Sequence, residues 1–152
     1  TVVLLIDEAQ RLSPASLELL RVLLNYEKNE HKLLQLILMG QPELLPRVRG
    51  MKNFWDRISL RHVINPLDEA EIHAMIAFRL RQAGYASRKS LFTAEAIHEI
   101  YRHTQGYPRR ITTLCHDALE QLVISDKEAV DEAIIHRLIE EESQLLGQLV
   151  LN

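Results

Sequence analysis

The sequence predicts an α/β fold in which a parallel-stranded core precedes an all-helical region. Two apolar runs, the unbroken Val2 to Ile6 and Leu33 to Gly40, have the composition of strands that are covered on both faces. A helical pattern lies between them, and a strand–helix–strand unit of this kind normally forms a parallel pair. After Pro66 the apolar residues recur only at helical spacing, so we predict two domains, residues 1–66 and 67–152.

The composition is that of a soluble globular protein. Hydrophobic residues make up 47% of the 152 residues and charged residues 26%, with a net charge of -3, which excludes a disordered chain or a strongly basic nucleic-acid binder. The single Cys115 can form neither an internal disulfide nor a cysteine metal quartet, and its apolar neighbours indicate a core thiol. No apolar run approaches the roughly 20 residues of a membrane span. We therefore expect a cytoplasmic location.

In the first domain, Ser13 and Pro14 form a typical helix start. Leucines at helical spacing continue this helix to about Asn25. A polar connection follows, and the second strand ends at Gly40 and Pro42. Short helical segments are expected between residues 43 and 59, and a further short strand over residues 61–65.

Four helices are predicted in the second domain. Asp68 and Glu71 have the spacing of a capping box, and Thr93 has the position of the second N-cap. Pro108 begins the third helix, and Asp131 caps the fourth.

An acidic pair follows the first strand directly. Asp7 at the end of a buried strand is well placed to hold Mg²⁺, usually through water, beside substrate phosphates. Glu8 can orient or deprotonate an attacking water, so the pair is typical of a nucleotide-hydrolysing site. The alternative is that both carboxylates only cap the turn into the next helix.

The second strand ends in a polar residue as well. Gln41 can hold an attacking water or a γ-phosphate, or its side chain can satisfy a turn backbone. The "DEAQ" tetrapeptide also occurs in helicases, but the Ser-Ala-Thr and Gly-Arg motifs expected of that class are absent from the sequence.

Three arginines are further candidates. Arg57 and Arg61 lie four residues apart before the domain boundary, where an arginine finger can stabilise transition-state charge on a phosphate of a neighbouring subunit. Arg109 lies in the first turn of the helix begun by Pro108, where the helix dipole disfavours positive charge, which suggests a nearby anion. Surface ion pairs and solvated arginines are the alternatives.

In chain order, five segments resemble the Walker B, sensor 1, arginine-finger, lid-entry and sensor 2 motifs of AAA+ ATPases. They are "VVLLIDEAQ", "LILMGQPEL", "WDRIS", "INPLDEAEI" and "GYPRRI". Their combination most resembles the general secretion pathway protein A family, with transposition helper ATPases as close relatives. The likeness covers nearly all of residues 1–140 and rests on the order and spacing of the motifs.

The resemblance implies an α/β nucleotide-binding core followed by a helical lid, with ATP and Mg²⁺ as cofactors. The roles carried over by it are Mg²⁺ binding for Asp7, water activation for Glu8, sensor 1 for Gln41, the arginine finger for Arg57 with Arg61 as the alternative, and sensor 2 for Arg109.

One AAA+ element is missing. The phosphate-binding pattern GxxxxGK[ST] does not occur in the 152 residues. We therefore expect the chain to be the C-terminal part of a longer ATPase and to bind ATP weakly or not at all by itself. The truncated sheet is also expected to make the isolated chain dimerise or aggregate.

Two functions follow from the resemblance. The favoured one is a ring-forming ATPase that drives assembly or secretion at the cytoplasmic face of the inner membrane, with a membrane-associated partner. The alternative is a DNA-binding transposition helper, but the basic residues of the second domain are interleaved with acids. A purely helical interaction module is disfavoured because its two buried-type strands would lack neighbours.

Overall fold

A computed structural model describes residues 2–25, 27–28, 31–87 and 89–150. The chain divides into two compact units, Thr1–Val63 and Ile64–Asn152. Each unit has its own hydrophobic core, and each is described by itself. The division falls a few residues before Pro66.

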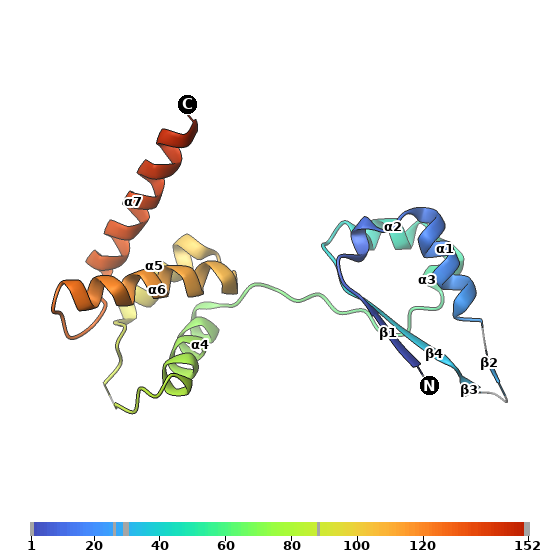
Figure 1. Cartoon of the computed structure of the whole chain (residues 1–152), viewed down its shortest axis with the longest axis horizontal. Coiled ribbons are helices and arrows are strands. Elements are labelled where there is room, and N and C mark those ends of the chain that lie inside the picture. Colours follow the sequence, from blue (N-terminus) through green and yellow to red (C-terminus); the bar gives the residue numbers. More distant parts are fainter. Residues whose placement is uncertain (1, 26, 29–30, 88, 151–152) are drawn as a thin grey trace. The chain divides into compact units, whose positions relative to one another are not determined.

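The first unit is built on two parallel strands, β1 (Val2–Ile6) and β4 (Leu34–Leu38). They are joined through the 3-10 helix η1 (Ala9–Arg11) and α1 (Pro14–Leu23), and they lie side by side (Figure 1). This confirms the predicted parallel strand–helix–strand unit. The helix begins as predicted, because the Ser13 side chain accepts a hydrogen bond from the N–H of Ser16 at 3.0 Å.

The connection after α1 contains structure that the sequence analysis did not predict. Two short strands, β2 (Glu27–Lys28) and β3 (His31–Lys32), form an antiparallel pair. The second long strand is accordingly shorter than expected, beginning at Leu34 and ending at Leu38. Its pairing continues past that end, since the N–H of Met39 donates to Ile6 O at 2.8 Å.

Only one face of the β1–β4 pair is covered within this unit. Leu17 of α1, Val48 of α2 (Leu44–Arg49) and Phe54 of α3 (Lys52–Trp55) form the centre of its core. On the opposite face Leu5 is 53% exposed and Ile37 45% exposed. The expectation of strands buried on both faces is therefore wrong for the described part of this unit, in which no element covers the second face.

Residues 58–68 form neither helix nor strand. The short strand predicted over residues 61–65 is wrong. Its apolar residues, Val63 and Ile64, are 68% and 89% exposed, so there is no buried face for an alternating pattern to fill. Pro66 also lacks the N–H that a strand would donate.

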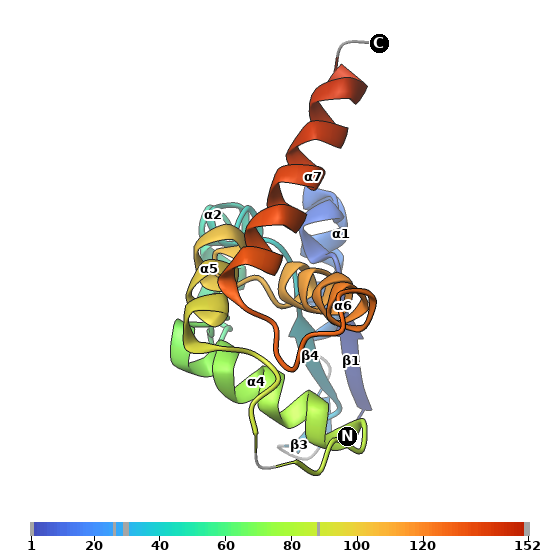
Figure 2. The ribbon, with the colours of Figure 1, turned by 90° about the vertical axis from the view of Figure 1, so that its left-hand side faces the viewer.

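The second unit contains four helices in its described residues. They are α4 (Glu69–Gln82), α5 (Ala94–Thr104), α6 (Pro108–Ile124) and α7 (Glu132–Val150) (Figure 2). The predicted starts are confirmed. Asp68 and Glu71 form a reciprocal capping box, and the side chains of Thr93 and Asp131 accept from the backbone N–H three residues on.

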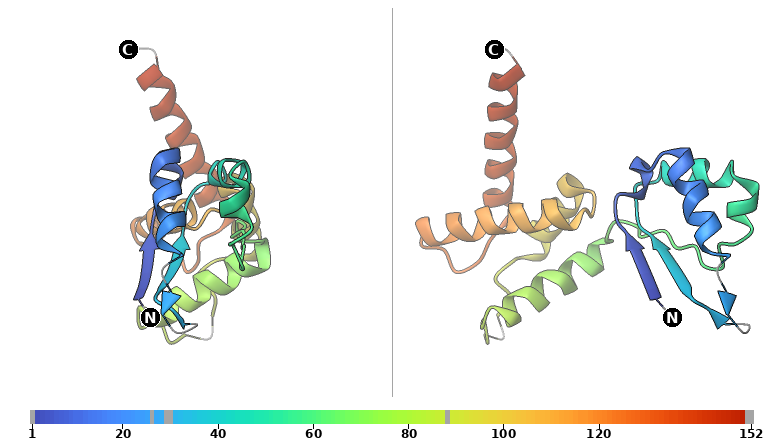
Figure 3. Two further views of the ribbon diagram at one scale, coloured as in Figure 1. Left: turned by 90° about the vertical axis from the view of Figure 1, so that its right-hand side faces the viewer. Right: turned by 45° about the vertical axis from the view of Figure 1, so that its right-hand side comes forward.

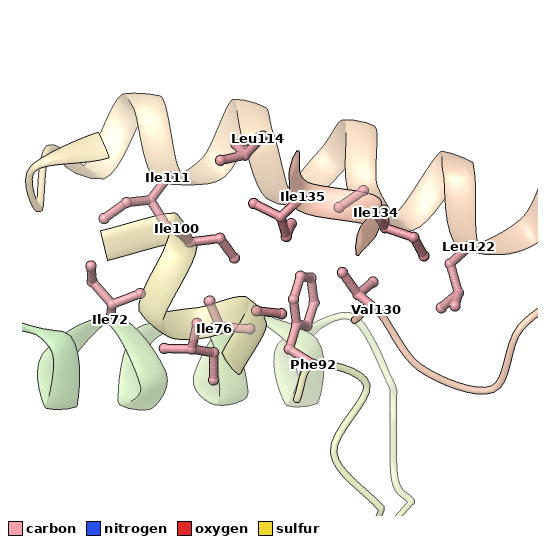
Figure 4. Packing of buried hydrophobic residues seen from close by; sticks show 13 residues of the cluster. Ile72, Ile76, Phe92, Ile100, Ile111, Leu114, Leu122, Val130, Ile134 and Ile135 are labelled. Atoms are coloured by element: carbon pink, nitrogen blue, oxygen red, sulfur yellow. The ribbon is translucent and has the colours of Figure 1, made fainter. Parts of the chain in front are cut away.

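Isoleucines from all four helices fill the core of the second unit (Figure 4). Ile72, Ile100, Ile111 and Ile134 are each fully buried. Cys115 packs against this cluster, and burial raises the pKa of its thiol to about 12, as expected of a core thiol. None of the helices in the described residues combines the length and hydropathy of a membrane-spanning segment.

Candidate functional site

The carboxyl ends of β1 and β4 gather the polar residues that the sequence singled out. The two strands are parallel (Figure 3). Asp7 and Glu8 therefore follow β1 at the same edge at which Gln41 follows β4. All three side chains are exposed. Oδ1 of Asp7 accepts the N–H of Glu8 at 2.8 Å. The structure therefore brings this part of the predicted site together.

Glu8 has an unusual backbone conformation. Its φ of 54° and ψ of 33° lie in the left-handed region, directly before η1. A side chain in this region costs of order 1–3 kcal/mol and persists where neighbouring structure enforces it. Here the N–H of Ala9 donates to Met39 O at 2.8 Å, which ties the turn to the end of β4.

Gln10 connects the two strand ends. Its Nε2 donates to Oε2 of Glu8 at 2.7 Å, and its Oε1 accepts the N–H of Gln41 at 3.1 Å. A carboxylate can only accept and a backbone N–H can only donate, so these partners fix the orientation of the amide. Sequence reasoning did not single out Gln10. The only available signal was its position as the last residue of "DEAQ".

The backbone of Gly40 passes close to Gln10. A Cβ atom at Gly40 would lie 2.7 Å from Oε1 of Gln10 and 3.3 Å from the N atom of Ala9. A side chain at this position would have to displace the Gln10 amide, so the close approach of β4 to the β1 turn favours glycine.

Arg47 of α2 holds the other side of the turn. Its guanidinium donates to the carbonyl oxygens of Gln10 and Leu12. The Arg47 side chain is half-buried and contacts η1 through these carbonyl oxygens. The Gln10 side chain contacts Glu8 and Gln41. The turn that carries Glu8 is thus bound to both β4 and α2.

The two arginine-finger candidates differ in their surroundings. The guanidinium carbon of Arg61 lies 4.2 Å from the ring centroid of Trp55, a cation–π contact. Arg57 comes after Asp56, the C-cap residue of α3, and the Arg57 side chain is exposed. Arg61 is therefore held within its own unit.

Arg109 belongs to the second unit. It lies in the first turn of α6, where Pro108 is the first residue and Tyr107 provides no side-chain cap. The first turn contains no acidic residue, and Arg109 is exposed. A free helix N-terminus flanked by arginine has the electrostatics of an anion site.

The donor set at the β1–β4 edge suits Mg²⁺. This ion takes oxygen ligands, retains several of its waters and is commonly held by one or two carboxylates together with substrate phosphates. Asp7 supplies such a carboxylate in an exposed position. Glu8 is the next residue along the chain, and Gln41 follows the neighbouring strand at the same edge.

The chain is similar to known proteins in both sequence and fold. The AAA domain family matches residues 1–48. The RuvB Holliday junction branch migration motor of Thermotoga maritima matches 91% of this chain and 43% of its own, with a TM-score of 0.64 and 18% identity. Residues 1–48 thus match an AAA domain, and the chain has the fold of part of an AAA+ ATPase.

Within this class the chain is similar to general secretion pathway protein A of Aeromonas hydrophila. The identity is 41% over 119 residues, which is 77% of this chain and 21% of that protein. An HTH-type transcriptional regulator of Methanocaldococcus jannaschii is 27% identical over 154 residues, 99% of this chain and 37% of its own length. The chain thus spans between about a fifth and two fifths of the length of these relatives.

Proposed function

We propose that this chain supplies the hydrolytic residues of an AAA+ ATPase that drives assembly or secretion at the bacterial cytoplasmic membrane. The observation that carries the proposal is the shared edge at which Asp7, Glu8 and Gln41 follow two adjacent parallel strands. Asp7 would hold Mg²⁺, Glu8 would take a proton from the attacking water, and Gln41 would contact that water or the γ-phosphate.

The chain is proposed to act within a longer polypeptide. Its 152 residues lack the GxxxxGK[ST] loop whose backbone N–H groups cradle phosphates. We call a polypeptide that joins this chain to such a loop the complete ATPase. By itself, the chain should show no saturable binding when a fluorescent ATP analogue is titrated to millimolar concentration. Micromolar affinity would contradict this proposal.

Arg57 is the preferred arginine finger. A finger must extend to a phosphate on a neighbouring subunit of a ring, whereas Arg61 already stacks on Trp55. In the complete ATPase, Arg57→Ala should lower turnover at least about 100-fold while leaving ATP binding intact, and Arg61→Ala should have a much smaller effect. The reverse ranking would assign the finger to Arg61.

Arg109 is the proposed sensor 2 residue of the helical unit. Its place in the uncapped first turn of α6 supports contact with a nucleotide phosphate. Through that contact the helical unit would respond to the nucleotide. We propose that the complete ATPase forms a ring of subunits. This ring would act in the cytoplasm, at the cytoplasmic face of the inner membrane, with a membrane-associated partner.

A DNA-binding transposition helper is the second candidate. It is supported by the likeness of this chain to a Holliday junction branch migration motor and to an HTH-type transcriptional regulator. Exposed basic residues of the second unit would contact phosphates, but two of them already pair with acids, Lys89 with Glu128 and Arg102 with Glu99. The basic set is Arg79, Arg81, Lys89, Arg102 and Arg110, with Arg88 outside the described residues.

The two candidates differ in one measurable property. A helper ATPase should bind duplex DNA with an affinity that falls steeply as salt is raised. A secretion ATPase should show no such binding at physiological salt. Fluorescence anisotropy of labelled duplex with the complete ATPase distinguishes them.

A further inference from the structure

Gln10 is the residue that links the proposed water-activating carboxylate to the neighbouring strand. One amide group contacts Glu8 through its nitrogen and Gln41 through its oxygen, across 31 positions of sequence. No other contact of this kind joins the two strand ends among the described side chains. The two hydrogen bonds, at 2.7 and 3.1 Å, require both strand ends to keep their present spacing.

We propose that Gln10 is a positioning residue, which holds the Glu8 carboxylate in its working orientation and couples it to the end of β4. This inference rests on the proposed ATPase function. Gln10 donates to Oε2 of Glu8, so Oε1 keeps both of its lone pairs and is the oxygen that we assign to take a proton from water. A carboxylate held at one oxygen loses rotamers that would carry it away from its substrate.

Several neighbouring groups hold Gln10 in place. Arg47 binds its carbonyl oxygen, and the N–H of Arg11 donates to Glu8 O at 2.9 Å within the same turn. Gly40 approaches so closely that a Cβ there would collide with Oε1 of Gln10. Movement at the end of β4, where Gly40 and Gln41 lie, must therefore displace the Gln10 amide and with it the carboxylate of Glu8.

The first test is Gln10→Ala in the complete ATPase. A carboxylate left to rotate should lower kcat roughly 10- to 100-fold, while the affinity for ATP changes by less than about twofold. Gln35→Ala is the matched control, because it makes the same change at an exposed position within β4. The control should retain wild-type turnover. An unchanged kcat in Gln10→Ala would overturn the proposal.

Gln10→Glu separates positioning from simple packing. The new side chain has nearly the same shape, but its carboxylate cannot donate to Glu8 and would repel it. We expect a loss of kcat at least as large as in Gln10→Ala. A Gln10→Glu variant with wild-type kcat would overturn the proposal.

Gly40→Ala perturbs the same contact from the opposite strand. Its Cβ should displace the Gln10 amide and lower kcat. If the two residues act through one contact, Gly40→Ala combined with Gln10→Ala should lose less than the product of the single losses. Independent, multiplicative losses would contradict coupling between β4 and Glu8.

Glu8→Gln distinguishes the failure of this inference from the failure of the ATPase proposal. If Glu8→Gln abolishes turnover and Gln10→Ala does not lower it, only the positioning role is wrong. If Glu8→Gln retains turnover, the proposed function of this edge is wrong. If both the ATPase proposal and the positioning role are right, Gln10→Ala should have no further effect in a Glu8→Gln background. The carboxylate that Gln10 positions is then already absent.

Discussion

At the scale of single residues, Gly106 is a position whose backbone conformation and surroundings leave no room for a side chain. It follows α5 with a φ of +78°, and a Cβ there would lie 2.1 Å from the carbonyl oxygen of Leu67. The same Leu67 donates its N–H to Gly106 O at 2.9 Å, which ties the entry of α4 to the turn before α6. Only glycine fits both the conformation and the contact.

Gly84 provides a matched comparison for Gly106. It has a φ of +92°, but a Cβ there would meet nothing within 4 Å. Gly84→Ala should cost about 1–2 kcal/mol for the left-handed conformation alone. Gly106→Ala should cost roughly 1–3 kcal/mol more, because the clash is with backbone. Urea unfolding followed by far-UV circular dichroism measures both, and equal costs would refute the Leu67 contact.

The site residues also show what sequence could and could not predict. Asp7, Glu8 and Gln41 follow strands whose apolar runs were clear, so their common edge could be predicted from parallel pairing alone. The Gln10 bridge could not be predicted, because it depends on the spacing of two segments 31 positions apart and on the left-handed turn at Glu8. Their chemical roles stay predictions.

At the scale of elements, helix starts were predicted well because their chemistry is local. Ser13, Asp68, Thr93 and Asp131 each cap a helix through a backbone group three residues away. The strand predicted over residues 61–65 was wrong because strands depend on distant partners. Alternating apolar residues specify a strand only where a sheet edge and a buried face exist.

The cap of α7 should make the second unit sensitive to acid. The hydrogen bond from the Lys127 ammonium at 2.6 Å, and then the N–H of Ile134, lower the pKa of Asp131. A lowered pKa in the folded state stabilises the fold above the unfolded value of about 3.9, and that stability disappears as the pH falls through the folded value. Stability should therefore decline below about pH 4.

Asp131→Asn tests this pH dependence. Asparagine retains the N-cap but carries no charge, so the variant should be less stable than the wild type at pH 7 and should lose less on acidification. Lys127→Ala should flatten the same profile by removing the ammonium. Thermal unfolding midpoints between pH 7 and 3 give the comparison. Parallel profiles for the wild type and both variants would rule out the assignment.

The uncovered apolar face of the β1–β4 pair should cause the isolated chain to self-associate. Leu5 and Ile37 project from adjacent strands and are about half exposed, beside unpaired strand edges. The isolated chain should self-associate as its concentration rises, and Leu5→Lys should suppress this. Leu19→Lys, at an exposed position of α1, is the control. Sedimentation velocity that shows a monomer at all concentrations would contradict the prediction.

At the scale of the whole molecule, the proposed functional residues are distributed over two compact units. The first unit carries the polar edge, with Asp7 and Glu8 after β1 and Gln41 after β4, and it also carries the finger candidates. The second carries Arg109 at the start of α6. Each has a core of its own, so substitutions in one core should leave the other folded. From the change of apolar period, the sequence predicted a domain boundary near Pro66, whereas the compact units divide between Val63 and Ile64.

We propose that Glu8 activates water in an AAA+ ATPase of which this chain forms part. The most direct measurement is ATP hydrolysis by the complete ATPase carrying Glu8→Gln, with ATP binding measured in parallel. The glutamine retains the shape of the side chain but cannot accept the proton. We predict a fall in kcat of at least about 100-fold with unchanged ATP affinity. Turnover equal to that of the wild type would contradict the claim.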